Sequence, residues 1–180
     1  MTTSSPGRPR RGECEAYYFT YIDRVPEDED ILQLLRRQHV QTPAFLLGLD
    51  AETLERRYAP GKWNVKEVVG HVVDAERVFG YRALCAVRRV PGDIPGMDQD
   101  AFAAAARHGE RPIGSVVAEY ETARAANLAF LTSVGEDEWD RRVRASGFEF
   151  TARSIAYILA GHEIHHLAII RERYLSRASR

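Results

Sequence analysis

Apolar residues recur every three or four positions in four long stretches of the chain, which is the spacing of one face of an α-helix. The connections between these stretches are short and hold only brief helical turns. Four long amphipathic helices joined in this way predict an all-α fold, a four-helix bundle with short extra helices in the connections. The long helices are expected at residues 27–48, 65–88, 113–134 and 153–174, and the short ones at residues 51–56 and 98–107.

Two local signals interrupt this helical pattern. Pro43 lies inside the first long helix, where a proline lacks the amide N–H of the helix and should kink or split it. Ser146 and Gly147, followed by residues 148–150, form the only plausible strand, and it is too short to build a sheet. We therefore expect no sheet in the fold.

The N-terminal residues differ in composition from the rest of the chain. Residues 1–16 are rich in Ser, Thr, Pro, Gly and Arg, so we expect a flexible N-terminal arm. Residues 17–180 should form a single four-helix-bundle domain, which is large enough to bury a sizeable core. An aromatic cluster at the start of this domain should pack onto it: Tyr17, Tyr18, Phe19 and Tyr21.

The bulk composition argues against several classes of protein. A net charge of −1 over 180 residues offers no attraction to nucleic acid or to an anionic membrane, and no apolar run is long enough to span a bilayer. The two cysteines, Cys14 and Cys85, form no disulfide framework, and the N-terminus lacks the apolar segment of a secretory signal. We therefore expect a cytoplasmic enzyme or binding protein.

The candidate chemistry lies in the last long helix, which contains the sequence HEIHH at residues 162–166. The apolar face of this helix passes through His162 and His166. Residues four apart on a helix differ by about 40° in direction, so both imidazoles should point inward from adjacent turns. An inward pair of imidazoles at this spacing is a simple bidentate metal chelate.

A third ligand has to come from elsewhere, and the remaining histidines are His39, His71, His108 and His165. His165 should point about 100° away from its neighbour His166. His108 lies in a polar connector, and His39 lies off the best apolar line of its helix. His71 is central on the apolar side of the second long helix and is the best candidate. Three neutral imidazoles on two facing helices would hold one divalent ion and leave positions open, which is the catalytic pattern.

The same segment satisfies the His-Glu-x-x-His motif of zinc proteases, in which the glutamate, here Glu163, activates water. The extended form of that motif requires Gly and His where this chain has Ile169 and Glu172. The expected lack of a sheet also counts against this class. A zinc protease is therefore disfavoured.

Three segments carry a family resemblance: PGKWNVKEVVGHVVDAERVFGYRAL at residues 60–84, GMDQDAFA at 96–103 and AYILAGHEIHHLAIIRERYL at 156–175. In these segments the chain resembles the DinB superfamily of DinB/YfiT-like proteins. The resemblance implies a four-helix bundle, often a homodimer, with a divalent metal ion held by three histidines. The motif of the family maps these ligands onto His71, His162 and His166.

One position departs from the family pattern. Many members carry Gly-Gln shortly after the last ligand, where this chain has Ala168 and Ile169. A role of that glutamine is therefore not shared, whereas the metal ligands are unaffected. A three-histidine site suits zinc, nickel or iron, and we expect one zinc or nickel ion per chain.

The resemblance also implies a reaction class, because the family includes thiol-dependent S-transferases and a thiol-dependent isomerase. The leading hypothesis is a metal-dependent transferase that acts on a small-molecule substrate with a low-molecular-weight thiol. The first alternative is a metal-dependent hydrolase that uses metal-bound water. The second alternative is a non-catalytic, metal-binding protein with a stress-related or regulatory role.

Four further residues are candidates for the site. Glu163 or Asp74 is expected to act as a catalytic base or to orient an imidazole. Arg82 lies almost three turns after His71 in the same direction, so it is expected to meet an anionic group of the substrate. Asn127 is the polar exception on the apolar face of the third long helix and is the other candidate for substrate binding.

Overall fold

The predicted long helices begin where polar side chains cap them. In the computed structural model, which describes residues 5–175, Asp30, Asn64 and Thr151 each accept a hydrogen bond from the backbone N–H three residues later. Such caps satisfy amide groups that the first turn of a helix leaves unbonded. The four long helices are α2 (Ile31–Leu47), α4 (Val65–Val87), α6 (Ile113–Leu131) and α7 (Ala152–Ile169).

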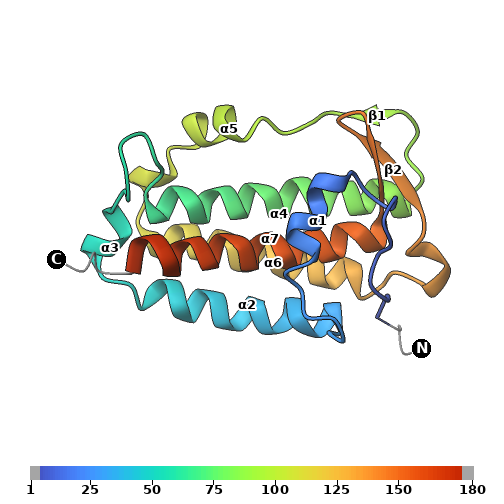
Figure 1. The fold of residues 1–180 in the computed structure, drawn as a ribbon, viewed down its shortest axis with the longest axis horizontal. Coiled ribbons are helices and arrows are strands. Elements are labelled where there is room, and N and C mark those ends of the chain that lie inside the picture. Colours follow the sequence, from blue (N-terminus) through green and yellow to red (C-terminus); the bar gives the residue numbers. More distant parts are fainter. Residues whose placement is uncertain (1–4, 176–180) are drawn as a thin grey trace.

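These four helices lie along the long axis of the molecule (Figure 1). α4 packs against α6 and α7, and α2 packs against the same two helices. The order around the bundle is therefore α2, α6, α4, α7, with α2 diagonally opposite α4. The prediction of a four-helix bundle is confirmed. α2 continues through Pro43 without interruption, so the expected split of this helix is wrong.

Short elements occupy the connections, as the sequence predicted. α1 packs against α7, and α5 packs along α4 (Figure 1). These two contacts place α1 and α5 beside the pair of long helices that carries the inward-pointing histidines. The short helical elements are η1 (Ala16–Tyr18), α1 (Phe19–Ile22), α3 (Ala51–Glu55), α5 (Gln99–Ala106), η2 (His108–Glu110), η3 (Glu136–Glu138) and the π-helical η4 (Ile170–Leu175).

A small sheet covers one end of the bundle, so the expectation of no sheet is wrong. β2 (Arg142–Ala145) pairs antiparallel with β3 (Phe148–Thr151), and β1 (Asp93–Ile94) pairs parallel with β2. Ser146 and Gly147 connect β2 to β3 with φ angles of 54° and 81°. Two successive residues with positive φ form the tight turn that suits a two-residue hairpin. The strand expected at residues 148–150 corresponds to β3, but its partners β1 and β2 were not recognised in the sequence.

Two apolar clusters fill the bundle, one at the end that carries α1 and the sheet and the other at the end that carries α3. Buried polar side chains separate them. In α2, for example, Gln38 and Thr42 stand between Leu35 of the first cluster and Leu46 of the second. In α7, His162 and Glu163 separate the clusters in the same way. The middle of the bundle is therefore a polar layer, and the candidate chemistry lies in it.

The N-terminal segment from residue 5 onward lies against the bundle. Glu13 is only 7% exposed, and its carboxylate accepts hydrogen bonds from Thr151 Oγ1 at 2.9 Å and from Arg153 Nε at 3.0 Å. Arg8 donates to the backbone oxygen of Ile22 at 2.8 Å. These contacts favour an attached segment over the freely moving arm that the composition of residues 1–16 suggested.

Replacement of Glu13 by glutamine should lower the melting temperature at pH 7. Charged hydrogen bonds of this kind contribute about 1.5–3 kcal/mol, which corresponds to roughly 3–12 °C for a chain of this size. Burial by itself would raise the pKa of Glu13, but the bonds from Arg153 and from the Arg10 backbone outweigh it and lower that pKa. The stabilisation is therefore present above the unfolded pKa of about 4.3 and is lost as the pH falls through the folded value.

Thermal melts of both proteins between pH 3 and pH 7 test this prediction. The difference in melting temperature should shrink steadily below about pH 4. Glu27→Gln is the matched control, because Glu27 is exposed and forms none of these bonds. Equal melting temperatures for wild type and Glu13→Gln at pH 7 would support the flexible arm instead.

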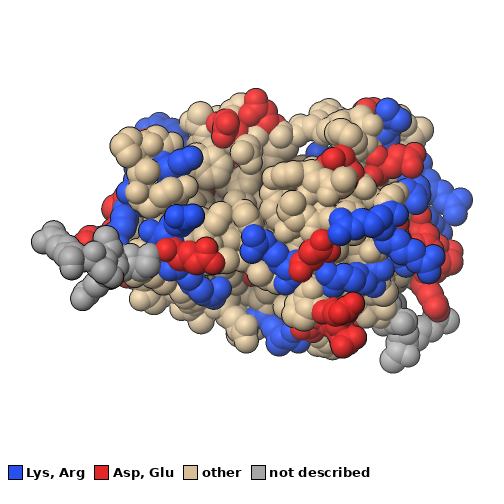
Figure 2. Space-filling model, in the orientation of Figure 1, with Lys and Arg blue, Asp and Glu red and all other residues tan. Residues whose placement is uncertain are grey.

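The surface carries charges of both signs. On the face of the molecule shown in Figure 2, Lys and Arg side chains are interspersed with Asp and Glu, without a continuous basic stripe. Nucleic-acid binding proteins concentrate basic residues on one face, so this face offers no such footprint. None of the helices within residues 5–175 is both long enough and apolar enough to cross a membrane.

Candidate metal centre

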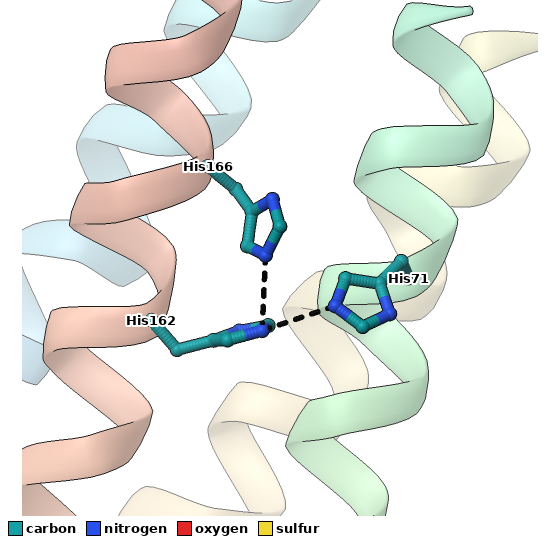
Figure 3. Close-up of side chains that lie close together, drawn as sticks. All are labelled: His71, His162 and His166. Atoms are coloured by element: carbon teal, nitrogen blue, oxygen red, sulfur yellow. Dashed lines mark hydrogen bonds between the residues drawn. The ribbon is translucent and has the colours of Figure 1, made fainter. Parts of the chain in front are cut away.

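Three histidines meet in the polar layer, between α4 and α7. The Nε2 atom of His162 lies 3.1 Å from Nε2 of His71 and 3.1 Å from Nε2 of His166. One ring nitrogen from each residue falls within 4.8 Å of the other two. Figure 3 shows the three rings pointing toward a common point, with His71 on one helix and the other two on the facing helix.

Helix geometry explains this arrangement. His162 and His166 are one turn apart on α7, so their side chains leave the same face of the helix. His71 lies on the buried side of α4, the helix that packs directly against α7. The ring of Trp63 lies 5.2 Å from that of His71, and the ring of Tyr21 lies 5.1 Å from that of His162. These aromatic rings limit the orientations that the two imidazoles can adopt.

Burial keeps the three imidazoles neutral. Removal from water lowers the pKa of His71 to about 4 and that of His166 to about 3, and it lowers the pKa of His162 well below its ordinary value. The neighbouring imidazoles disfavour protonation of His162 and His166 further. All three rings therefore hold free lone pairs at neutral pH, which is the state that binds a metal ion.

The close contacts among the rings fit a shared cation. The Nε2 atom of an imidazole either donates one hydrogen bond or accepts one. His162 Nε2 faces two other Nε2 atoms, so these rings cannot satisfy one another completely. A divalent ion accepts a lone pair from each nitrogen at once. The donor set of three imidazoles suits zinc, nickel or iron.

The other histidines do not join this group. His165 stacks edge-on against Tyr21 and lies beside His166, but its ring nitrogens are not part of the cluster. His108 is buried against Gly70, where an added Cβ would come within 2.1 Å of its ring. His39 is also outside the cluster. The structure therefore brings together the three histidines that the sequence favoured.

Glu163, the expected base, belongs to a buried ion network. It is completely buried and accepts hydrogen bonds from Tyr120 Oη at 2.7 Å, from Arg124 at 2.6 Å and from Thr42 Oγ1. Arg124 also binds both carboxylate oxygens of Glu76, at 2.6 and 3.0 Å. Three donors in the core therefore hold the carboxylate of Glu163. A role of this glutamate as a catalytic base stays a prediction.

Asp74 and Asn127 lie beside other groups of the protein. The carboxylate of Asp74 lies 3.5 Å from Nε2 of His108, but neither that Nε2 atom nor Nδ1 of His71 has a hydrogen-bond partner among residues 5–175. Asn127 donates to the backbone oxygen and to the carboxylate of Glu76, both at 2.9 Å. The polar exception on α6 is therefore explained by its bonds to α4.

Two cavities flank the histidine cluster. One has a volume of about 190 Å³ and is lined by His71, His162 and Arg82, together with the aromatic residues of the N-terminal segment. The other has a volume of about 370 Å³ and is lined by His166 and Asp100. Gln99 of α5 lines both cavities. The cluster is therefore reachable from two sides.

Several of these lining residues were not singled out as site residues in the sequence. Trp63 and Gln99 lie in segments that carry the family resemblance, at residues 60–84 and 96–103, but nothing in the sequence marks them or Tyr21 as site residues, because each lies in a short element or a connector. Asp100 follows the cap of α5, and its charge favours protonation of His71. The Asp-Gln-Asp run at residues 98–100 was the available signal, although the sequence did not indicate where this connector lies.

Comparisons with known proteins match both the fold and the segments of the site. The model of the DinB superfamily matches residues 34–170. A protein from Oceanobacillus iheyensis that is named a candidate metal-dependent hydrolase is 26% identical over 157 residues, which covers 82% of this chain and 89% of that protein. The solved structure of YfiT from Bacillus subtilis superimposes with a TM-score of 0.66 at 16% identity, over 91% of this chain and 89% of YfiT. YfiT is described as a probable metal-dependent hydrolase with an unusual four-helix bundle topology.

Proposed function

Because the chain belongs to the DinB superfamily, we propose that His71, His162 and His166 hold one divalent metal ion and that the protein is an enzyme acting on a small molecule. The observation that carries this proposal is the convergence of three neutral imidazole nitrogens at one point, two from buried histidines and one from the half-buried His166. Three ligands from the protein leave further positions of a metal ion open, as in catalytic sites. Zinc and nickel are the proposed metals.

A metal ion bound there would lower the pKa of a ligated thiol or water molecule and hold it beside an electrophile. The residues of this chain supply the surroundings for that step. The half-buried rings of Trp63 and Tyr21 lie against two of the imidazoles and limit their movement. Gln99 and Asp100 of α5 bring polar groups to the cavities.

The two cavities support a reaction of two small molecules. Aromatic residues line both cavities, but the one beside His71 and His162 also contains Arg82, whereas the one beside His166 contains Lys62 and Asp100. Hydrolysis requires space for only one organic substrate, since the second reactant is water. Separate cavities of different character suit a low-molecular-weight thiol on one side and an electrophilic substrate on the other. We therefore place a metal-dependent, thiol-using transferase first.

Metal-dependent hydrolysis is the second candidate, and the names of the Oceanobacillus and Bacillus relatives favour it. In this reaction a carboxylate has to accept a proton from water next to the histidines. Glu163 is hydrogen-bonded to Arg124, and Asp74 lies 3.5 Å from His108 Nε2 without a hydrogen bond to it. Asp100 lines the cavity with His166 and is exposed, so it is the proposed base in this case.

A substrate screen with and without thiol tests this proposal. Protein purified without a metal-binding tag is first loaded with zinc or nickel, and His71→Ala serves as the control. Electrophiles such as monobromobimane are offered with cysteine, glutathione or coenzyme A, and esters and amides are offered without thiol. Turnover that depends on both thiol and metal supports the transferase. Thiol-independent turnover supports the hydrolase, and metal binding without turnover on any substrate would favour a non-catalytic metal carrier.

Two further properties stay proposals. A homodimer is proposed from the family resemblance, and light scattering on the same sample measures it directly. We propose the cytoplasm as the compartment because Cys14 and Cys85 are both free and buried, so the fold does not use an oxidising environment.

A further inference from the structure

Arg82 occupies an unusual place in the aromatic cavity beside the histidine cluster. It lies on α4, eleven residues after His71, which corresponds to almost three turns and about 16 Å along the helix. Helical side chains tilt toward the N-terminus of their helix. The Arg82 guanidinium lies 5.0 Å from the centre of the Phe79 ring, one turn earlier, and Arg82 lines the same cavity as His71.

This guanidinium is buried without a counter-charge. Arg82 is only 3% exposed, and its one hydrogen bond goes to Ser146 Oγ at 3.3 Å. Its Nε atom has no partner, and no carboxylate forms an ion pair with it within residues 5–175. Arg124, the other arginine that is buried to this degree, binds the carboxylates of Glu76 and Glu163. The polar capacity of Arg82 is therefore largely unused.

Aromatic rings satisfy only part of this capacity. The Arg82 guanidinium lies 5.0 Å from the Phe79 ring centre and 5.4 Å from that of Phe150. Such cation–π contacts stabilise a buried cation by less than the cost of burying an unpaired ion. They also leave N–H groups along the edge of the guanidinium free. These groups form a planar fork, which can donate two parallel hydrogen bonds to one carboxylate.

We propose that Arg82 binds the carboxylate of the substrate, and that this cavity takes small organic acids with an apolar or aromatic body. The body would lie against Phe79 and Tyr18, whose rings pack edge to face at 5.8 Å. The other end of the molecule would then point to His71 and His162, which line the same cavity. The placement of the other end at His71 and His162 rests on the proposed function, whereas binding of the carboxylate by Arg82 does not depend on a metal.

Fluorine NMR on the metal-free protein tests this site separately from any activity. The probe is 4-fluorobenzoate, titrated into protein kept in EDTA, and 4-fluorobenzamide is the neutral molecule of the same shape. We expect saturable binding of the acid, at least about tenfold tighter than that of the amide, because a charged hydrogen-bonded pair contributes more than about 1.4 kcal/mol. Equal binding of acid and amide, or no binding of either, would overturn the proposal.

Two variants of Arg82 and one control complete the experiment. Arg82→Gln should weaken binding of the acid at least tenfold and leave that of the amide unchanged, and Arg82→Lys should restore part of the affinity. Arg88→Gln removes the same charge from an exposed position near the end of α4 and should bind as the wild type does. Circular dichroism checks that each variant is folded. Unchanged affinity in both Arg82 variants would rule out the assigned site, even if the metal centre is active.

Discussion

Replacement of His71 by alanine is expected to reduce the metal content from about one ion per chain to nearly none. The Nε2 atom of His71 lies 3.1 Å from that of His162, and it is the only ligand that α4 contributes to the cluster. Changes in residues that merely support a metal ligand cost 10–100-fold in affinity, so loss of a ligand itself should cost more than about 100-fold. Elemental analysis of protein prepared without a metal-binding tag measures this directly.

The neighbouring histidines supply sharp controls. His162→Ala should lose the metal as His71→Ala does, because His162 contacts both other ligands. His165→Ala should keep it, since its ring faces Tyr21 and lies outside the cluster. Stoichiometric metal in His71→Ala, or a large loss in His165→Ala, would mean that the ligand set is wrong.

Replacement of Arg124 by methionine is expected to have the largest effect on stability. Arg124 is completely buried and pairs with Glu76 and Glu163, which are also buried. Burial would lower the pKa of Arg124, but the two carboxylates outweigh it and raise that pKa well above its ordinary value. Removing the cation leaves two buried carboxylates without a counter-charge, which costs about 3–5 kcal/mol. The melting temperature should fall by roughly 6–20 °C.

A compensating variant tests the cause of this loss. Arg124→Met combined with Glu76→Gln and Glu163→Gln removes both charges that the single variant leaves unpaired, so it should recover much of the lost stability. Melting curves at pH 7 for the wild type, the single variant and the triple variant provide the comparison. A single variant that melts within about 2 °C of the wild type would show that the network contributes little.

Local rules were sufficient for the helices and for two of the three histidines of the candidate metal centre. The positions of His162 and His166 on one face of α7 follow from 3.6 residues per turn, which holds for any helix. The caps at Asn64 and Thr151 are also local, because each side chain bonds to the backbone three residues later. Such features require only a short segment, and a short segment is what a sequence pattern describes.

Partners far apart in the chain were beyond these rules. Glu163 and Asn127 are polar residues on buried faces, and the sequence alone suggested that both face a substrate. In the structure their partners are Arg124, 39 residues before Glu163, and Glu76, 51 residues before Asn127. A pattern within one helix shows that a polar residue points inward, but it does not show which charge the neighbouring helices place opposite.

The sequence by itself determined that this protein is a bundle of four amphipathic helices with an inward pair of imidazoles at chelating distance. Only the tertiary structure decided what surrounds that pair. The packing of α4 against α7 brings His71 to the pair, and α1 and α5 border the two cavities beside it. Of the two buried arginines within residues 5–175, Arg124 is paired with carboxylates, whereas Arg82 is not. The periodicity of a helix is a property of one segment, whereas the pairing of buried charges depends on how several segments pack.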